Sequence, residues 1–352
     1  MTARLLLTIL LSLGTSLCSA ADRVPGNSVF GDHNYIEYVP GDLPLIIAAP
    51  HGGRETPVEI PNRTNGVLDS DANTQELART IAAVVHAQTG RHIHLIICRL
   101  HRSKLDANRE QAEAAQGSAL GEHAWAEHHA FIEEACAAAV KQFGAAFLID
   151  LHGHGHKDAR VELGYLHTAR ELANGEDHLN APSFVTRSSL RLIAENGRLS
   201  YAQLLHGTES LGALLEAQGF PATPSPRMPV PTEPFFRGGY TIARHCDASR
   251  HITGLQIEAN RPRLRDTSAN RLRFAHALVG ALNPFFAANL GFEISGRKTP
   301  AAGFSCYSLR QVPPQGSPNT SIRHAAQPDL AERHPAQEKS PASAAPQVSQ
   351  QP

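Results

Sequence analysis

The segment 145–156 reads AAFLIDLHGHGH, in which a short run of apolar residues passes directly into aspartate, histidine and glycine. Two comparable runs occur at 43–49, LPLIIAA followed by PHGG, and at 252–260, ITGLQIEAN. Short aliphatic runs are typical of strands that are buried on both faces of a sheet. Such strands seldom hold carboxylates unless these are paired or bind a metal. The segment therefore predicts a covered strand that leads into a loop carrying chemistry.

Helical patterns alternate with these strands. Apolar residues recur at helical spacing in four segments: 74–90, 122–143, 201–218 and 268–282. Two further runs, 92–100 and 161–167, are typical of strands. Because short strands alternate with helices, we expect an α/β fold with a largely parallel sheet covered by helices on both faces.

The two ends of the chain differ from this part. Residues 1–20 combine Arg4, a short apolar run and small residues, which is typical of a cleaved secretory signal peptide and too short for a membrane span. Residues 313–352 hold eight prolines and no aromatic residue, so they cannot bury enough apolar surface to fold. We expect one folded domain over 21–312, a disordered tail, and a periplasmic or secreted protein.

The charge balance excludes some partners. Lys and Arg number 32 against 33 Asp and Glu, which removes the positive surface expected of a nucleic-acid binder or a peripheral membrane protein. Charged residues make up 18% of the chain while histidines number 20, which favours metal or proton chemistry. Beyond residue 20, four cysteines allow three disulfide pairings, between which the sequence does not choose: Cys98, Cys136, Cys246 and Cys306.

Ionisable side chains stand at three strand ends. His51 follows the strand 43–49, the run from Asp150 to His156 follows the apolar residues 146–149, and Glu258 lies in 252–260. Ligands of open α/β sheets bind beyond the carboxyl ends of the strands, so we expect these side chains to meet. Imidazoles and a carboxylate with one open position suit a catalytic zinc. The alternative is that each histidine is a surface or hydrogen-bonded core residue.

Six motifs in series carry a resemblance to a known family: PHGG at 50–53, DANTQELA at 71–78, RSKLDANR at 102–109, DLHGHGH at 150–156, FFRGGYT at 235–241 and LQIEANRPRLR at 255–265. In this order, over about 40–285, they resemble the N-formylglutamate amidohydrolase family. The resemblance implies the fold of the zinc-dependent exopeptidases, a three-layer α/β/α arrangement around a mixed, mostly parallel sheet. It also implies Zn²⁺ as the cofactor.

The resemblance makes His51 and His152 the imidazole ligands of the zinc. Zinc carboxypeptidases place a glutamate three residues after the first histidine, but Arg54 stands there in this chain. Two carboxylates could replace it, Asp71 and Glu55. Asp71 is favoured because it opens a pattern similar to that of related poly-γ-glutamate hydrolases, although an acid in a first helical turn is also stabilised by the helix dipole.

Glu258 resembles the general base of the fold, which accepts a proton from water and passes it to the leaving amine. Its alternative role is a core salt bridge with Arg261 or Arg263. His154 lies between glycines, so it could turn inward to support the zinc or to hold substrate.

Substrate anchoring is assigned by the same resemblance. Asn108 and Arg109 resemble the pair that holds a substrate carboxylate, with Arg109 a further contributor to oxyanion stabilisation and Asp106 orienting it. Arg237 and Tyr240 of the FFRGGY motif are additional substrate-binding candidates. By contrast, Arg102 and Lys104 are expected in surface salt bridges, and the two histidines at 128–129 are expected to pack or face solvent.

These features together predict an exported, zinc-dependent amidohydrolase that cleaves the C–N amide bond of an N-acyl amino acid, like an N-formylglutamate deformylase. A zinc carboxypeptidase or a hydrolase of γ-glutamyl or cell-wall peptides is the alternative, and the signal peptide favours it. A third possibility is a binding protein that kept the pocket without catalysis. The expected partner is a small N-acyl amino acid or short peptide, with no nucleic acid and no membrane after signal cleavage.

Overall fold

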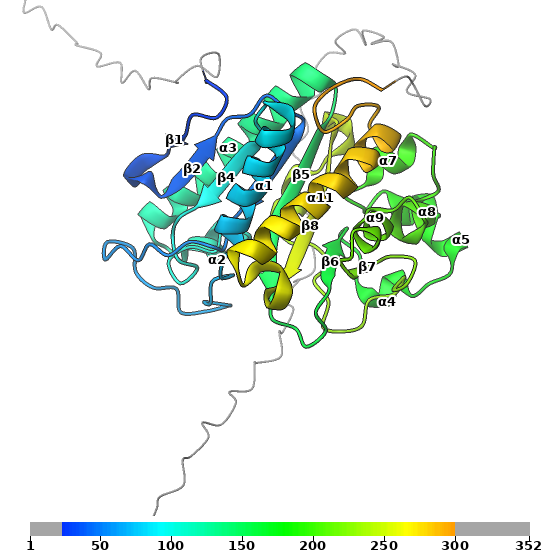
Figure 1. Cartoon of the computed structure of the whole chain (residues 1–352). Helices are drawn as coiled ribbons and strands as arrows, with labels where there is room; N and C mark the ends of the chain where they lie inside the picture. The colour runs from blue at the N-terminus through cyan, green and yellow to red at the C-terminus, as the bar shows by residue number, and fades with distance from the viewer. Residues whose placement is uncertain (1–22, 300–352) are drawn as a thin grey trace, which may run out of the picture. The chain divides into compact units, whose positions relative to one another are not determined.

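An eight-stranded sheet, in the order β1-β2-β4-β3-β5-β8-β6-β7, forms the centre of residues 23–299, which are the residues that this computed structural model describes (Figure 1). The predictions for 1–20 and 313–352, the boundary at 312 and Cys306 lie outside the described residues. Cys98, Cys136 and Cys246 are free thiols. Within residues 23–299, no helix is long and apolar enough to cross a membrane.

The sheet is mixed and has a parallel centre. Its strands are β1 Val29–Phe30, β2 Ile36–Val39, β3 Leu45–Ala49, β4 His94–Cys98, β5 Ala146–His154, β6 Val161–Gly164, β7 Ala222–Thr223 and β8 Ile252–Asn260. Strands β4, β3, β5 and β8 run parallel to one another, while β2 and β6 pair antiparallel with β4 and β8. This confirms the predicted α/β class with a mixed, mostly parallel sheet and flanking helices.

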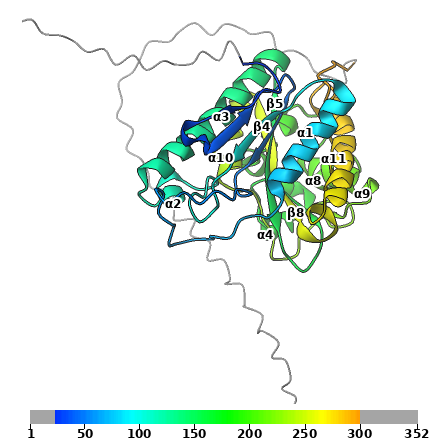
Figure 2. The same cartoon turned by 60° about the vertical axis from the view of Figure 1, so that its left-hand side comes forward.

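Helices cover both faces of the sheet. They are α1 Thr74–Thr89, α2 Gln111–Ala115, α3 Ala119–Phe143, α4 Ala169–Leu172, α5 Glu176–Leu179, α6 Pro182–Val185, α7 Arg191–Glu195, α8 Tyr201–His206, α9 Leu211–Ala217, α10 Tyr240–His245 and α11 Ser268–Asn289. Short 3-10 segments lie at Asp32–Asn34 and Ala248–Arg250, and a π-helical turn lies at Arg261–Arg265. Figure 2 shows α3 on one side of the sheet and α1 with α11 on the other.

The apolar residues of each central strand divide between the two faces. Leu45 and Ile47 of β3 share a buried cluster with Ile81 of α1, whereas Ile46 shares the other cluster with Ile132 of α3. Successive side chains of a strand point to opposite faces, so a strand covered by helices on both sides must be apolar at every position. This is why 43–49 reads as an unbroken aliphatic run.

Three details differ from the sequence predictions. The helix expected over 201–218 is two helices. Helix α8 ends at His206, and α9 begins at Leu211 after the N-cap Ser210, whose hydroxyl accepts a hydrogen bond from the Ala213 amide. Helix α11 continues to Asn289 with Pro284 inside it. Strand β5 extends through His154, so Asp150 and His152 lie within the strand rather than in a following loop.

Candidate metal and catalytic site

Polar side chains alternate with apolar ones at the carboxyl ends of β5 and β8. Leu151 of β5 and Ile257 of β8 point into the cluster under α1 and α11, so their neighbours in sequence point to the α3 side. The residues on that side are Asp150, His152, His154, Gln256, Glu258 and Asn260. In the parallel ladder His152 lies directly beside Glu258. The strand periodicity therefore gathers carboxylates and imidazoles at one end of one face.

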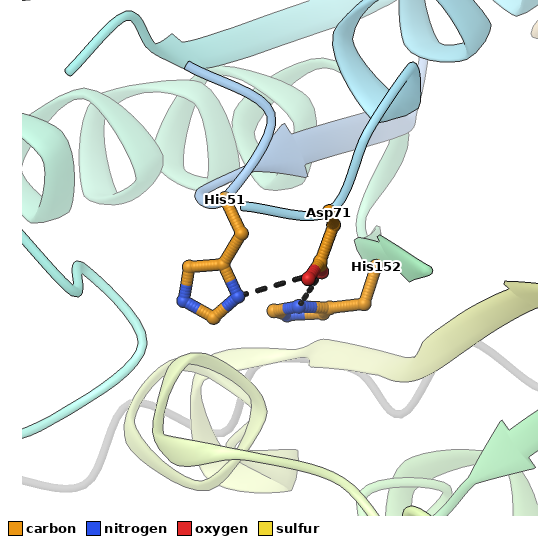
Figure 3. Close-up of side chains that lie close together, drawn as sticks. All are labelled: His51, Asp71 and His152. Carbon is orange, nitrogen blue, oxygen red and sulfur yellow. Dashed lines mark hydrogen bonds and ion pairs between the residues drawn. The ribbon is translucent and has the colours of Figure 1, made fainter. Parts of the chain in front are cut away.

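His51, Asp71 and His152 converge at this end (Figure 3). Nδ1 of His51 lies 3.5 Å from Oδ2 of Asp71, and Nδ1 of His152 lies 3.2 Å from the same oxygen. One ligand atom from each of the three residues lies within 4.8 Å of the others. Both histidines are buried, and Asp71 is nearly so.

Backbone hydrogen bonds hold Asp71 in place between strand ends. Its amide donates to the carbonyl of His51 at 2.9 Å, and its Oδ2 accepts from the amide of Gly153 at 3.1 Å. Position 153 must be glycine in this arrangement, because a Cβ there would overlap the guanidinium of Arg265. Asp71 thus joins the segment after β3 to the end of β5 before α1 begins.

A carboxylate stands behind each imidazole. Nε2 of His51 lies 2.6 Å from Oδ1 of Asp106, and Nε2 of His152 lies 2.8 Å from Oδ2 of Asp150. Each carboxylate accepts the Nε2–H, which leaves Nδ1 of each ring directed at Asp71. Histidine ligands of metals characteristically donate their second nitrogen to a carboxylate or carbonyl in this way.

An unsatisfied buried nitrogen supports a metal between these residues. Nδ1 of His51 is fully buried and has no hydrogen-bond partner within residues 23–299. Burial raises the pKa of Asp71, but the two neighbouring imidazoles of His152 and His51 outweigh it and hold that pKa well below its ordinary value. Asp71 therefore stays ionised between two imidazoles. The donor set of two Nδ1 atoms and one carboxylate fits a divalent cation.

Glu55, the alternative third ligand, lies elsewhere. Its carboxylate pairs with the guanidinium of Arg99 at 2.5 Å, and its backbone forms a bridge with Leu100 beyond β4. Of the two predicted carboxylates, the structure thus brings only Asp71 to His51 and His152.

Glu258 is a buried carboxyl on the same face of the sheet. Burial raises its pKa to about 8, the carboxylates of Asp71 and Glu162 add to the rise, and His152 opposes it. Its Oε1 accepts a hydrogen bond from the Gln256 side chain at 3.0 Å. Within residues 23–299 Glu258 forms no ion pair, so the core salt bridge considered as its alternative role is not formed.

Asn108 lies at the site, whereas Arg109 turns toward the surface. Nδ2 of Asn108 is 3.1 Å from Nε2 of His152, and its Oδ1 accepts the Thr241 amide at 2.7 Å. The guanidinium of Arg109 donates to Glu113 at 3.1 Å and to the carbonyl of Asn108 at 2.8 Å. The catalytic and substrate-binding roles assigned to Asn108 and Arg109 stay predictions.

The other candidate anchors occupy separate places. Arg237 donates to the carbonyl of Leu166 at 3.3 Å, and the Tyr240 hydroxyl accepts from Arg244 at 3.1 Å at the start of α10. His154 is buried, with its Nε2 donating to the carbonyl of Arg160 at 2.8 Å. Substrate binding by Arg237, Tyr240 and His154 also stays a prediction.

Several residues around the site differ from expectation. Asp106, expected to orient Arg109, instead holds His51 and accepts a hydrogen bond from Nε of Arg102 at 2.9 Å. Arg102 is buried rather than in a surface salt bridge, and its NH1 lies 3.7 Å from Asp71. From the sequence we did not predict that Asp150 would hydrogen-bond to His152. The signal was present, because Asp150 precedes His152 by two residues on a buried strand, and residues two apart on a strand share a face.

Comparisons with known proteins give a limited result. No protein-family model matches the chain, and no curated protein matches it. Among solved structures it is similar to an N-formylglutamate amidohydrolase from Ralstonia eutropha, at 14% identity and a TM-score of 0.45 over 72% of this chain and 97% of that one. It is also similar to a gene product from Agrobacterium tumefaciens, at 13% identity and a TM-score of 0.41 over 70% and 93% of the two chains. It is similar as well to a candidate metallopeptidase from Shewanella amazonensis, at 15% identity and a TM-score of 0.34 over 75% of this chain and 86% of that one. Likeness at these values assigns neither an activity nor a substrate to this chain.

Proposed function

We propose that this protein is a zinc-dependent hydrolase that cleaves the C–N amide bond of a small N-acyl amino acid. The observation that carries the proposal is the convergence of His51, Asp71 and His152, each imidazole held from behind by a buried carboxylate, beside the buried Glu258. Three protein ligands with room for a fourth are characteristic of catalytic rather than structural zinc sites.

His51, His152 and Asp71 would hold the metal. A bound zinc supplies Lewis-acid polarisation of a substrate carbonyl and lowers the pKa of a coordinated water. Arg102 lies near both Asp71 and Asp106, so its guanidinium fixes the positions of these two carboxylates relative to each other. Asp106 and Asp150 keep the two imidazoles in the tautomer that directs Nδ1 at the metal position.

Glu258 is the group that moves the proton. It lies beside His152 in the parallel ladder, with its side chain on the face that carries the site. Burial raises its pKa to about 8, so this carboxyl is a stronger base than an exposed glutamate and can hand the proton to a leaving amine near neutral pH. We assign it the transfer of a proton from attacking water to the leaving nitrogen.

The substrate assignment rests on the motif resemblance and on Asn108. Its side chain touches His152, so a substrate group bound by Asn108 would lie next to the metal position, and Arg109 would have to leave Glu113 to reach the same group. The protein would meet this substrate in the periplasm or outside the cell, since residues 1–20 have the pattern of a cleaved signal peptide. Zinc is the expected cofactor.

A second candidate is a carboxypeptidase or a hydrolase of γ-glutamyl or cell-wall peptides. The N-terminal export pattern favours it, because an exported enzyme meets wall peptides more readily than metabolic intermediates. A binding protein without catalysis is the remaining alternative, and an intact Glu258 beside the three ligands argues against it.

The test combines zinc content with a substrate panel. The purified protein should hold zinc and hydrolyse N-formyl amino acids faster than γ-glutamyl peptides; the reverse order would favour the second candidate. His51→Ala and His152→Ala should lose the zinc bound at this site and, with it, activity. Asp71→Asn should weaken zinc retention, whereas its matched control Glu55→Gln should not. Full zinc in His152→Ala, or no hydrolysis of any amide by the zinc-loaded protein, would refute the proposal.

A further inference from the structure

A second cluster of histidines and a carboxylate lies next to the first one along the sheet. It consists of His154 at the end of β5, His156 in the following turn and Glu162 on β6. One ligand atom of each lies within 4.8 Å of the others. His154 and Glu162 are buried and His156 is nearly so, with 15% of its side chain exposed.

The two imidazoles present their Nδ1 atoms to this cluster. Nε2 of His154 donates to the buried carbonyl of Arg160 at 2.8 Å, which fixes the tautomer and leaves the Nδ1 lone pair on the inner side. That lone pair accepts the His156 amide at 3.1 Å, a hydrogen bond that a cation bound at Nδ1 would replace. Nδ1 of His156 lies 2.9 Å from Oε1 of Glu162, and its ring stacks on Phe236 with centroids 4.9 Å apart. Both rings are thus oriented by groups outside the cluster.

Glu162 is likewise held by its surroundings. The Phe236 amide donates to its Oε2 at 2.9 Å, and Arg160 donates to its Oε1 at 3.2 Å. Arg160 is itself fixed by the carbonyls of Thr232 and Pro234. A carboxylate oxygen has two lone pairs, so Oε1 can accept from Arg160 and bind a cation at the same time. Metal-binding carboxylates are usually hydrogen-bonded in this manner.

The position of Glu162 gives a reason for positive charge here. In the antiparallel ladder Glu162 lies directly opposite Glu258, and both side chains are buried on the same face. Buried carboxylates are costly unless cations or hydrogen bonds compensate them. Arg160 compensates Glu162 in part, and Glu258 has no ion pair within the described residues.

We propose that His154, His156 and Glu162 form a second divalent-cation site, distinct from the one at His51, Asp71 and His152. Two imidazoles and a carboxylate are a zinc donor set, so Zn²⁺ is the expected ion. A cation at His156 Nδ1 would replace the proton that this nitrogen shares with Glu162, and the neutral ring would then carry its one proton on Nε2. His152 and His154 are two residues apart on one strand, so their backbones are about 7 Å apart and each belongs to its own cluster. The proposal goes beyond the hydrolase, which needs one metal.

The experiment counts zinc in the metal-free protein after reloading. The protein is stripped with a chelator, dialysed against buffered Zn²⁺, separated from free ion by gel filtration and analysed by elemental mass spectrometry. Wild type should bind two equivalents, and His156→Ala and His51→Ala one each. The double variant should bind none. The matched control is His123→Ala, which changes a histidine in the exposed group Asp32, His123 and Glu127. This variant should keep two equivalents of zinc.

Glu162→Gln provides a variant of nearly unchanged shape and should also fall to one equivalent. Circular dichroism and melting temperature of each variant establish that it is folded. One equivalent in wild type at saturating zinc, or two in folded His156→Ala, would overturn the second site. These outcomes leave the first site untouched, because that site is tested separately, by whether His51→Ala or His152→Ala keeps as much zinc as wild type.

Discussion

The strongest test of the site geometry is Asp150→Asn, which changes a residue that we do not expect to touch metal or substrate. Asp150 is fully buried on β5 and its Oδ2 lies 2.8 Å from Nε2 of His152, which is also buried. The asparagine side chain keeps the shape and can keep an oxygen on His152. Its amide nitrogen would take the place of Oδ1, a buried atom without a hydrogen-bond partner in residues 23–299.

The expected effect follows from the loss of charge in this one hydrogen bond. Hydrogen bonds to charged groups contribute about 1.5–3 kcal/mol and neutral ones about 0.5–1.5, so the substitution should cost about 1–2 kcal/mol of metal binding. No water can replace the lost charge, because both partners are buried. Zinc affinity should therefore fall by about 5- to 30-fold, which overlaps the roughly 10- to 100-fold cost of removing a partner of a metal-binding histidine.

The assay is competition for Zn²⁺ with a chromophoric chelator, which yields the dissociation constant directly. Asp177→Asn removes the same charge from an exposed position on α5 and serves as the control, with an unchanged affinity. Asp150→Ala should weaken binding further than Asp150→Asn. An Asp150→Asn protein that binds zinc as tightly as wild type would refute the idea that the carboxylate orients His152.

Three further predictions follow from the same structure. Glu258→Gln should retain zinc at His51, Asp71 and His152 yet lose amide hydrolysis by about 10²–10⁴-fold, and a wild-type rate would remove Glu258 from the reaction. Burial lowers the pKa of three histidines to about 4: His94, His128 and His167. Between pH 6.5 and 4 the unfolded state therefore binds more protons than the folded state, so the free energy of unfolding must fall as the pH decreases through that window. The slope approaches about 1.4 kcal/mol per pH unit for each histidine only below pH 6.5, so the three together cost roughly 5 kcal/mol between pH 6.5 and 5. Denaturant unfolding at both pH values measures this loss. Phe147→Ala removes a fully buried ring that packs on Phe285 and Phe286, and should lower the free energy of unfolding by about 3–5 kcal/mol. A variant as stable as wild type would contradict this packing.

Much of the site could be predicted from the sequence, because apolar and polar residues alternate on β5. Strands covered on both faces stay apolar until they reach the sheet edge, so Asp150, His152 and Glu258 stood out against their neighbours. Helix α1 was equally readable, since Leu77 and Ile81 recur at helical spacing before Gly90 ends it. By contrast, β1 and β2 are short strands at one end of the sheet order, and a two- to four-residue strand has too few residues to show a period.

The amino-acid sequence by itself determined the α/β class, the central strands and the two histidines at strand ends, because these depend on local periodicity and on parallel strands ending at one edge. Only the tertiary structure shows that Asp71, and not Glu55, lies beside the two histidines. That placement depends on how the segment after β3 folds back, with the Asp71 amide on the His51 carbonyl and Glu55 on Arg99. The tertiary structure likewise decided that Asp106 stands behind His51. Residues 55 positions apart come together only through packing, and no local pattern records which side chain will face which.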